Sequence, residues 1–221
     1  MVGVFKHGRT FKTILIEGNI SSGKTTFLNY LKRYDDVACI IPEPIDKWSN
    51  MNGCNLLNEM YNNVTMWGPS FQSYVLLTMV SSHIAETTKS YKFMERSCHS
   101  AMNCFAKNML LQELMDPGMY SVLEKWYDFL TSTMDLSFNK IVYIRTSPTV
   151  IYDRMVRRGR KEEANVTLEY LTQIHKMYED WLFGINSLYH KDDILVLNGD
   201  LDEYEIGPEY LRTENFIFND N

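Results

Sequence analysis

The chain has 221 residues, of which 45% are hydrophobic, and it carries a formal net charge of −6 at pH 7. A chain of this size and composition can bury a sizeable core, so we expect one domain over residues 1–221 with its core at about residues 12–200. The acidic balance argues against a general nucleic-acid binder, because such proteins draw their salt-dependent affinity from a basic surface.

The first predicted elements are a strand, a glycine-rich turn and a helix. Apolar residues 11–16 predict a buried strand, and apolar residues at helical spacing follow up to residue 32. The turn between them fits the phosphate-binding pattern G-x-x-x-x-G-K-[ST], and because both flanking elements agree with it we set aside a chance glycine turn. The residues expected to bind a nucleotide triphosphate are Gly18, Asn19, Ile20, Ser21, Ser22, Gly23, Lys24, Thr25 and Thr26.

The chemistry of this turn follows from its backbone and two side chains. A Cβ at Gly18 or Gly23 is expected to obstruct the backbone amides that point inward to a phosphate chain. The start of the following helix favours an anion through its unpaired N–H groups. Lys24 can reach the β- and γ-phosphates, and the hydroxyl of Thr25 can ligate Mg²⁺.

A second buried strand is predicted over residues 37–41 and is followed by Pro42-Glu43-Pro44. The prolines restrict the backbone around Glu43 and place its carboxylate at the C-terminal end of a strand, where open α/β sheets bind their ligands. On spacing alone, a solvent-facing loop glutamate is an equally good interpretation.

Residues 69–88 predict a helix with Gln72, Val75 and Met79 on one face. Such a stripe usually packs in a core. The glutamine is unusual there, because a buried amide needs hydrogen-bond partners, which the base of a ligand would supply. Core packing and a ligand pocket both remain open.

A third strand over residues 91–94 runs into Glu95-Arg96-Ser97 and then into a helix that carries Ala101 and Phe105 at i, i+4. An acid followed at once by an arginine at the end of a strand is suited to contact a metal and a phosphate. A surface ion pair is the alternative, and it would be nearly neutral energetically.

The second half of the chain continues the alternation of strands and helices. We expect helices over residues 120–134 and 167–189, a helix starting at Ser147-Pro148, and strands over residues 140–144 and 193–197. This order predicts a parallel sheet with helices on both faces. The tail, residues 206–221, gives no clear signal, and we expect partial disorder at its end.

A run of charged residues lies at the end of the helix that starts at Ser147-Pro148. It surrounds Gly159 and contains Arg154, Arg157, Arg158, Arg160 and Lys161, followed by Glu162 and Glu163. A cationic loop of this kind can close over a triphosphate, so we interpret it as a lid, with Arg158 and Arg160 as its ligands; a solvated helix end is the alternative.

Cysteines, histidines and apolar runs limit which compartment and which metal sites are expected. The cysteines Cys39, Cys54, Cys98 and Cys104 lack metal or disulfide spacing, and we interpret His83, His99 and His175 as ordinary helix residues. No apolar run has the length of a membrane helix, so we expect a cytoplasmic or nuclear protein that binds no membrane. The basic Lys6, Arg9 and Lys12 are also typical of the end of a transit peptide, which predicts a mitochondrial location if the N-terminus is truncated.

Taken together, five ordered motifs resemble the deoxyribonucleoside kinase family over roughly residues 12–200. They are Gly18 to Thr25, Pro42-Glu43-Pro44 with Lys47-Trp48, Phe71-Gln72-Ser73-Tyr74, Glu95-Arg96-Ser97 and the arginine-rich lid. The resemblance implies a five-stranded parallel sheet, a homodimer, and Mg²⁺-dependent transfer of the γ-phosphate of ATP to the 5′-hydroxyl of a deoxyribonucleoside.

The resemblance also implies a role for each matched residue. Glu43 would be the general base, Arg96 would contact the 5′-oxygen and the migrating charge, and Thr25 and Glu95 would hold Mg²⁺. The residues implied to bind the nucleoside are Trp48, Tyr61, Gln72, Val75, Met79, Arg96, Ala101, Phe105 and Glu163. The chain departs from the family at Met102-Asn103, where relatives usually carry an Arg-Tyr pair whose arginine braces the pocket.

Two other functions share these features. A guanine-specific switch would show N-K-x-D, and Asn139-Lys140-Ile141-Val142 lacks the aspartate. A nucleoside monophosphate kinase shares the loop, sheet and lid, but it would need an arginine clamp for the phosphate of its substrate, whereas the face of Gln72 offers neutral groups. We therefore expect a nucleoside kinase, with a nucleoside monophosphate kinase as the alternative. Because the amide of Gln72 can match the edge of thymine or of cytosine, we expect thymidine and deoxycytidine to be preferred over purines.

Overall fold

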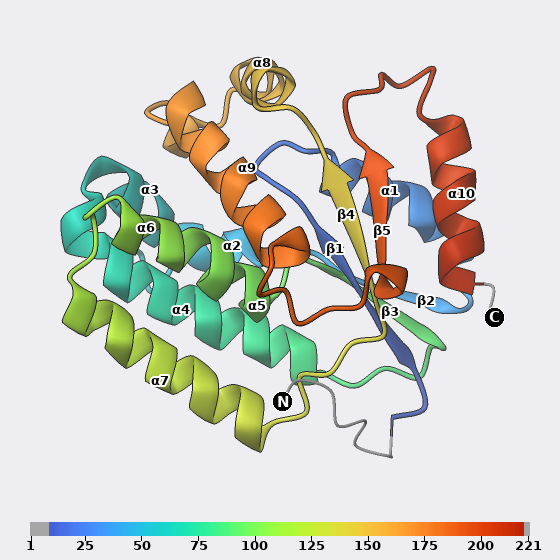
Figure 1. Ribbon diagram of the computed structural model, residues 1–221, viewed down its shortest axis with the longest axis horizontal. Coiled ribbons are helices and arrows are strands. Elements are labelled where there is room, and N and C mark those ends of the chain that lie inside the picture. Colours follow the sequence, from blue (N-terminus) through green and yellow to red (C-terminus); the bar gives the residue numbers. More distant parts are fainter. Residues whose placement is uncertain (1–8, 219–221) are drawn as a thin grey trace.

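The computed structural model describes residues 9–218, and its centre is one sheet of five parallel strands (Figure 1). The strands are β1 (Lys12–Glu17), β2 (Ala38–Ile41), β3 (Tyr91–Glu95), β4 (Lys140–Arg145) and β5 (Ile194–Asn198). Their order across the sheet is β2-β3-β1-β4-β5, so β1 lies in the middle. The α/β architecture predicted from the alternation of elements is confirmed, with strand ends shifted by about one residue.

Successive side chains of β1 point to opposite faces of the sheet, and different helices cover the two faces. Ile14 and Ile16 are fully buried in the cluster that includes side chains of α1 (Lys24–Leu31) and α10 (Gly207–Phe218). Leu15 points to the other face and packs with side chains of α9 (Leu168–Phe183). A strand that is apolar on both faces is typical of a parallel sheet buried between helices.

A further layer of helices packs beside the sheet and forms its own apolar cluster. It is built on α4 (Val64–Ile84) and α7 (Pro117–Thr133), which lie side by side in Figure 1, together with the short helices α2 (Ile45–Ser49) and α3 (Leu56–Asn62). This layer forms one wall of the cavity described below. No helix in the described part of the chain is long and apolar enough to cross a membrane.

Four helix boundaries differ by more than one residue from the sequence expectation, and one of them is the start of α7, at Pro117 instead of residue 120. α4 begins at Val64 instead of residue 69, because the side chain of Asn63 caps the helix by accepting from the N–H of Met66, and Pro69 therefore lies inside the helix. α4 ends at Ile84, four residues short of the expected end at residue 88. α9 ends at Phe183 instead of residue 189. Gly184 follows, where an added Cβ would lie 2.3 Å from the carbonyl oxygen of Asp180.

The helix after β3 is interrupted by a wider turn. α5 (Cys98–Ser100) passes into a π-helical turn, η2 (Ala101–Ala106), and then into α6 (Lys107–Leu111). Such turns are rare and often lie at functional sites. Here the turn contains Ala101 and Phe105, both of which line the cavity.

The remaining elements connect this framework. They are η1 (Lys32–Tyr34), α8 (Pro148–Arg158), η3 (Lys161–Glu163) and η4 (Lys191–Asp193). The tail that gave no sequence signal forms α10 up to Phe218, and it packs on α1 through Tyr210, whose ring lies 4.5 Å from that of Tyr30. The end of the tail, where disorder was expected, and the basic residue Lys6 lie outside the described residues.

Candidate active site

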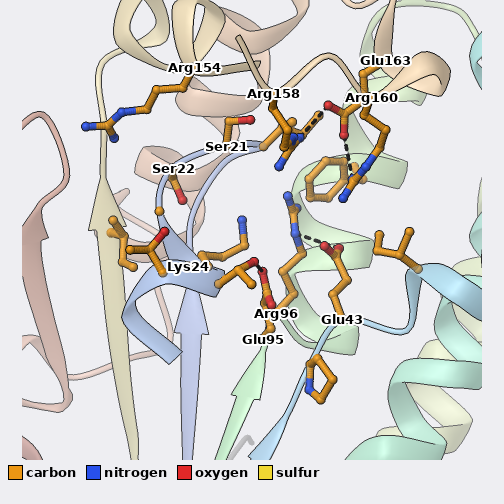
Figure 2. Close-up of a pocket in the computed structure, with 18 of the residues that line it drawn as sticks. Ser21, Ser22, Lys24, Glu43, Glu95, Arg96, Arg154, Arg158, Arg160 and Glu163 are labelled. Carbon is orange, nitrogen blue, oxygen red and sulfur yellow. Dashed lines mark hydrogen bonds and ion pairs between the residues drawn. The ribbon is translucent and has the colours of Figure 1, made fainter. Parts of the chain in front are cut away.

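A cavity of about 810 Å³ opens at the carboxyl ends of the strands. Its walls come from the loop between β1 and α1, the ends of β2 and β3, α4, the turn η2, the lid after α8 and the segment between β5 and α10. In Figure 2, charged side chains from the phosphate loop, the ends of β2 and β3 and the lid face one space, whereas Arg154 points away from it. In a parallel sheet the ends of successive strands meet at the same edge, so residues distant in sequence can act on one ligand.

The two glycines of the phosphate-binding loop are required for different reasons. At Gly18 (φ 149°) an added Cβ would lie 2.6 Å from Ser22 Oγ and 2.7 Å from the carbonyl oxygen of Ile144. At Gly23 (φ 105°) an added Cβ would meet no atom within 4 Å, so the left-handed backbone itself favours glycine. We expected a Cβ at either glycine to obstruct inward-pointing amides, whereas it would meet a side chain and a carbonyl oxygen at Gly18 and no atom within 4 Å at Gly23.

Gly23 is also the N-cap of α1, and no side chain caps this helix end. The N–H groups of the first turn are therefore available to an anion. Ile20, Ser21, Ser22, Lys24, Thr25 and Thr26 line the cavity with Gly23. Gly18 and Asn19 are not part of this lining; the side-chain amide of Asn19 instead donates to the carbonyl oxygen of Leu171 in α9 at 2.8 Å.

Lys24 is a buried cation at the mouth of the loop. Its Nζ donates to the backbone oxygen of Asn19 at 2.6 Å. Burial, reinforced by the charge of Arg96, lowers the pKa of Lys24 to about 8, and the carboxylates of Glu43 and Glu95 act in the opposite direction. A phosphate bound at this loop would place a negative charge beside the ammonium group of Lys24 and favour its charged form.

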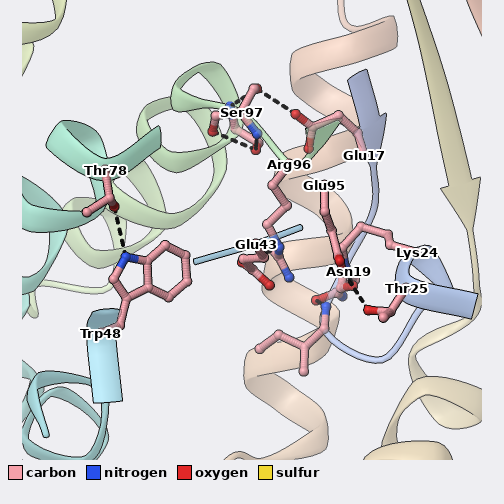
Figure 3. Close-up of polar contacts among 12 residues, drawn as sticks. Glu17, Asn19, Lys24, Thr25, Glu43, Trp48, Thr78, Glu95, Arg96 and Ser97 are labelled. Atoms are coloured by element: carbon pink, nitrogen blue, oxygen red, sulfur yellow. Dashed lines mark hydrogen bonds and ion pairs between the residues drawn. The ribbon is translucent and has the colours of Figure 1, made fainter. Parts of the chain in front are cut away.

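Thr25 and Glu95 form a pair of oxygen ligands beside the loop. Thr25 Oγ1 donates to Glu95 Oε1 at 2.7 Å, and both residues line the cavity (Figure 3). Hydroxyl and carboxylate oxygens are the hard ligands that Mg²⁺ prefers, so the donor set fits that ion.

Glu43 and Arg96 meet in the middle of the cavity (Figures 2 and 3). Arg96 Nε lies 2.9 Å from Glu43 Oε1, in an ion pair that is not aligned as a hydrogen bond. Burial disfavours the charge of Arg96, but the carboxylates of Glu43, Glu17 and Glu95, together with Tyr178, outweigh it and raise the pKa of the guanidinium. The guanidinium also lies over the ring of Phe105 at 4.5 Å.

The deep end of the cavity is mostly apolar around one amide. Gln72 is 3% exposed, and its Oε1 has no hydrogen-bond partner. Val75, Met79 and Ala101 are also buried and line the same space. A buried carbonyl oxygen without a donor is costly, so this wall is suited to a ligand that brings an N–H group.

Three further residues with predicted roles complete this end of the cavity. The ring of Trp48 packs edge-on against Phe71 at 5.7 Å, and its Nε1 donates to Thr78 Oγ1 at 2.9 Å (Figure 3). Tyr61 and Phe105 also belong to the lining. In the turn η2, Met102 is buried and Asn103 donates to the carbonyl oxygen of His99 at 2.9 Å, so the Met-Asn departure is accommodated locally.

The lid places two arginines and one glutamate over the cavity. Arg158 and Arg160 donate to the two carboxylate oxygens of Glu163 at 2.5 and 2.9 Å (Figure 2). Arg154 has a different task, since it donates to the carbonyl oxygens of Gly199 and Leu201 and joins α8 to the segment after β5. Arg157 and Lys161 are not part of the cavity lining. The predicted cationic run therefore has several roles.

One part of the cavity was missed by sequence reasoning. Leu201, Asp202, Glu203, Ile206 and Tyr210 line the end beyond the phosphate loop. Ile206 and Tyr210 belong to the tail that gave no clear signal, and the other three residues lie between that tail and the last predicted strand. The Gly207-Pro208 pair at the start of α10 is the one local feature that could have marked a helix there.

The buried histidines form a cluster that sequence spacing did not reveal. Ligand atoms of His83, Cys98 and His99 lie within 4.8 Å of one another. Burial, reinforced by repulsion from His99, Lys92 and Arg9, lowers the pKa of His83 to about 3. An environment that already contains two cations is unfavourable for a metal ion, so we interpret the cluster as packing. The four cysteines Cys39, Cys54, Cys98 and Cys104 are free.

Comparison with known proteins agrees with this geometry. The family model described as "Deoxynucleoside kinase" matches residues 14–213. The chain is 40% identical over 187 residues to the human protein "Thymidine kinase 2, mitochondrial", covering 85% of this chain and 70% of the relative. It is 34% identical over 195 residues to "Deoxycytidine kinase 1" of Xenopus laevis, covering 77% and 74%. It is 32% identical over 199 residues to mouse "Deoxycytidine kinase", covering 79% and 76%. The chain therefore belongs to the deoxynucleoside kinase family of ATP-dependent phosphotransferases.

Proposed function

We propose that this protein, as a single catalytic domain, transfers the γ-phosphate of ATP to the 5′-hydroxyl of a pyrimidine deoxyribonucleoside, with thymidine as its best substrate. The observation that carries the proposal is the unpartnered Oε1 of Gln72, buried beside Met79 and Ala101 at one end of the cavity that also contains the phosphate loop. A neutral ligand with an N–H group fits that end, and a triphosphate fits the other.

The reacting groups would meet between these two ends. Glu43 would take the proton of the 5′-hydroxyl as the 5′-oxygen forms its bond to the γ-phosphorus and the bond to ADP breaks. The Nε–H of Arg96 has no aligned acceptor, so it can donate to the 5′-oxygen or to the migrating phosphoryl group. Lys24 would stabilise charge on the β- and γ-phosphates, and Arg158 and Arg160 would close over them.

A magnesium ion is part of the proposal. Thr25 and Glu95 would hold it, partly through water, because they are adjacent oxygen ligands at the phosphate loop. When bound, Mg²⁺ neutralises charge that develops on the phosphates. Glu95→Gln should therefore raise the Mg²⁺ concentration that gives half-maximal turnover, whereas an unchanged Mg²⁺ dependence would contradict this assignment.

The base preference follows from the wall around Gln72. Its amide can accept from N3–H and donate to O4 of thymine, and in the flipped orientation it can pair with N3 and the amino group of cytosine. By resemblance, deoxycytidine kinases carry an arginine and an aspartate at the positions of Met79 and Ala101. Such a pair would crowd the thymine methyl group. Here both side chains are apolar and leave room for it. Trp48 and Phe105 would pack on the base, and the sugar 3′-hydroxyl would bind Tyr61 and Glu163.

A radiolabelled ATP assay tests this proposal directly. It should be run with thymidine, deoxycytidine, deoxyadenosine and deoxyguanosine, and with the corresponding monophosphates. We expect the label in thymidine monophosphate first and in deoxycytidine monophosphate second. Labelled diphosphates would instead indicate the nucleoside monophosphate kinase activity that remains the alternative, and a preference for purines would contradict the placement of Met79 and Ala101 beside the base.

We further propose that two copies of the chain associate through α4 and α7. Each helix exposes an apolar stripe at helical spacing, with Met66, Leu77 and Ile84 on α4 and Met119, Val122, Trp126 and Phe129 on α7. Exposed apolar surface that spans two adjacent helices is typical of an interface. Light scattering coupled to gel filtration should give a dimer, and Trp126→Glu should give a monomer. A monomeric natural protein would reject the proposal.

The compartment also needs a direct test. The human relative is named as mitochondrial, and the basic residues near the start of this chain were expected to end a transit peptide. Arg9, which pairs with Asp135, and Lys12, the first residue of β1, instead belong to the folded domain, and the cysteine spacing favours the cytoplasm or nucleus. Imaging of the C-terminally tagged protein expressed from its own gene would decide between these locations.

A further inference from the structure

A buried polar junction lies directly behind the reacting groups. Glu17, the last residue of β1, is 0% exposed and is not part of the cavity lining. Ser97 Oγ donates to its Oε1 at 2.6 Å (Figure 3), and the hydroxyl of Tyr178 donates to its Oε2 at 3.1 Å. The junction therefore joins β1, the turn after β3, and α9.

The donors offset only part of the cost of burying an acid at this depth. Burial raises the pKa of Glu17 to about 7, while hydrogen bonds from Ser97 and Ser100, the charge of Arg96 and the hydroxyl of Tyr178 favour the ionised form. Burying an acid costs more folding free energy than burying an apolar residue of the same size, even when several hydrogen-bond donors surround the acid. Packing alone does not account for it.

Arg96 is attached to this junction. Its Nη1 donates to the hydroxyl of Tyr178 at 3.4 Å, so hydrogen bonds run in one direction from Arg96 through Tyr178 to Glu17. Phe105, over which the guanidinium lies, packs edge-on against the ring of Tyr178 at 6.4 Å. Glu43 holds the guanidinium from the cavity side, and Tyr178 holds it from behind.

The backbone of Arg96 makes this support necessary. Its φ of 62° is left-handed, a conformation that costs a non-glycine residue roughly 1–3 kcal/mol and persists only where the surroundings impose it. One constraint is the bond from its N–H to the carbonyl oxygen of Ile16 at 2.9 Å, next to Glu17. The neighbouring Ser97 is tied to Glu17 directly.

We propose that Glu17 is a positioning residue for phosphoryl transfer, which fixes Tyr178 and, through Tyr178, the guanidinium of Arg96 against the transferring group. This inference rests on the role proposed above for Arg96. Because a misplacement of about 1 Å in a catalytic group can cost roughly 10²-fold in rate, a residue that touches no substrate can still govern turnover.

The test compares Tyr178→Phe and Glu17→Gln with Tyr143→Phe. Tyr143 is a matched control, since its ring stacks on that of Tyr178 at 5.6 Å and its hydroxyl also donates to a glutamate, Glu179, at 3.0 Å, away from Arg96. We expect Tyr178→Phe and Glu17→Gln to lower kcat by roughly tenfold or more. KM for thymidine and for ATP should stay within about twofold, and Tyr143→Phe should leave kcat within about twofold.

A second arm asks whether the effect passes through Arg96. In an Arg96→Lys background, which removes the guanidinium, Tyr178→Phe should lower kcat by less than about twofold, because the group that it positions is gone. An undiminished effect in that background would overturn the inference, as would wild-type kcat in both Tyr178→Phe and Glu17→Gln. If Glu17→Gln does not fold, Tyr178→Phe still decides the matter.

A third arm is independent of turnover. The Nε–H resonance of Arg96, assigned by its loss in Arg96→Lys, should be sharp in the natural protein and in Tyr143→Phe, and it should broaden or shift in Tyr178→Phe. An unchanged resonance would overturn the inference even if the protein phosphorylated no nucleoside. If the proposed function is wrong, the natural protein itself will form no labelled product, and no variant is needed to see this.

Discussion

Replacing Glu43 by Gln tests the chemistry of the site most directly. The substitution keeps the size of the side chain and removes the charge that faces Arg96 at 2.9 Å. A general base typically contributes about 10²–10⁴-fold, so the activation barrier should rise by roughly 2.7–5.5 kcal/mol. KM for thymidine should change little, because the lost interaction acts on a proton that moves only during the reaction.

The same substitution has a separate and smaller effect on stability. The side chains of Glu43 and Arg96 are 16% and 8% exposed, so the pair is largely buried. Removing one partner of a fully buried pair costs about 3–5 kcal/mol. Here the amide of Gln remains a hydrogen-bond acceptor, and Arg96 keeps its bond to Tyr178, so we expect about 1–2 kcal/mol, or a fall in Tm of a few degrees.

The assay must separate these two effects. Initial rates with saturating ATP and thymidine should be measured well below the Tm of Glu43→Gln, together with thermal melts of both proteins. Glu43→Asp is the matched control, because it keeps the charge and shortens the side chain, and it should retain more activity than Glu43→Gln. A loss below about tenfold in Glu43→Gln, or equal losses in both variants, would show that Glu43 positions the substrate instead of taking its proton.

Four other predictions concern charge and burial. Lys24→Ala should lower kcat by about 10²-fold or more with an unchanged circular dichroism spectrum, because the lost group acts on the phosphates, and near-normal turnover would reject the assignment. Arg158→Ala should lower kcat and raise KM for ATP but not for thymidine; unaltered ATP kinetics would make the lid a solvated helix end. Met79→Arg with Ala101→Asp should lower kcat/KM for thymidine at least about tenfold more than for deoxycytidine, and each single change should be worse because it buries an unpaired charge. Burial lowers the pKa of His99 from 6.5 to about 4, so the unfolded chain binds the proton first and stability should fall as pH drops from 6.5 through about 4. Urea unfolding should show a shallower fall in His99→Gln, and an equal slope would contradict this.

The local parts of the site could be predicted from sequence. The phosphate loop is one continuous motif between a strand and a helix, and its residues reach the cavity except Gly18 and Asn19. Glu43 and Arg96 could be placed because each follows a strand, and the ends of parallel strands share one edge of the sheet. β2 and β3 are neighbours in the sheet, which explains why these two side chains are close enough to pair.

The remaining features depend on contacts that no local pattern records. Tyr178 reaches Glu17 across 161 residues, and neither position has a distinctive neighbourhood in the sequence. Proline is common at the first position of a helix, which predicts a start at Pro69, but the cap at Asn63 determines the start of α4. The segment after β5 entered the cavity wall because α10 folds back onto α1, and nothing in the segment itself indicated this packing.

The left-handed backbone at Arg96 has a consequence for protein engineering. Of the four non-glycine residues with positive φ in the described chain, Ser21 and Arg96 line the cavity. Glycine adopts either backbone conformation without steric strain. Selection for thermal stability alone would therefore favour glycine at both positions. At Ser21 such a change would relieve the backbone and keep the loop's amides. At Arg96 it would remove the guanidinium that we propose acts on the transferring phosphate, so a more stable variant of this protein has to be selected for turnover and stability together.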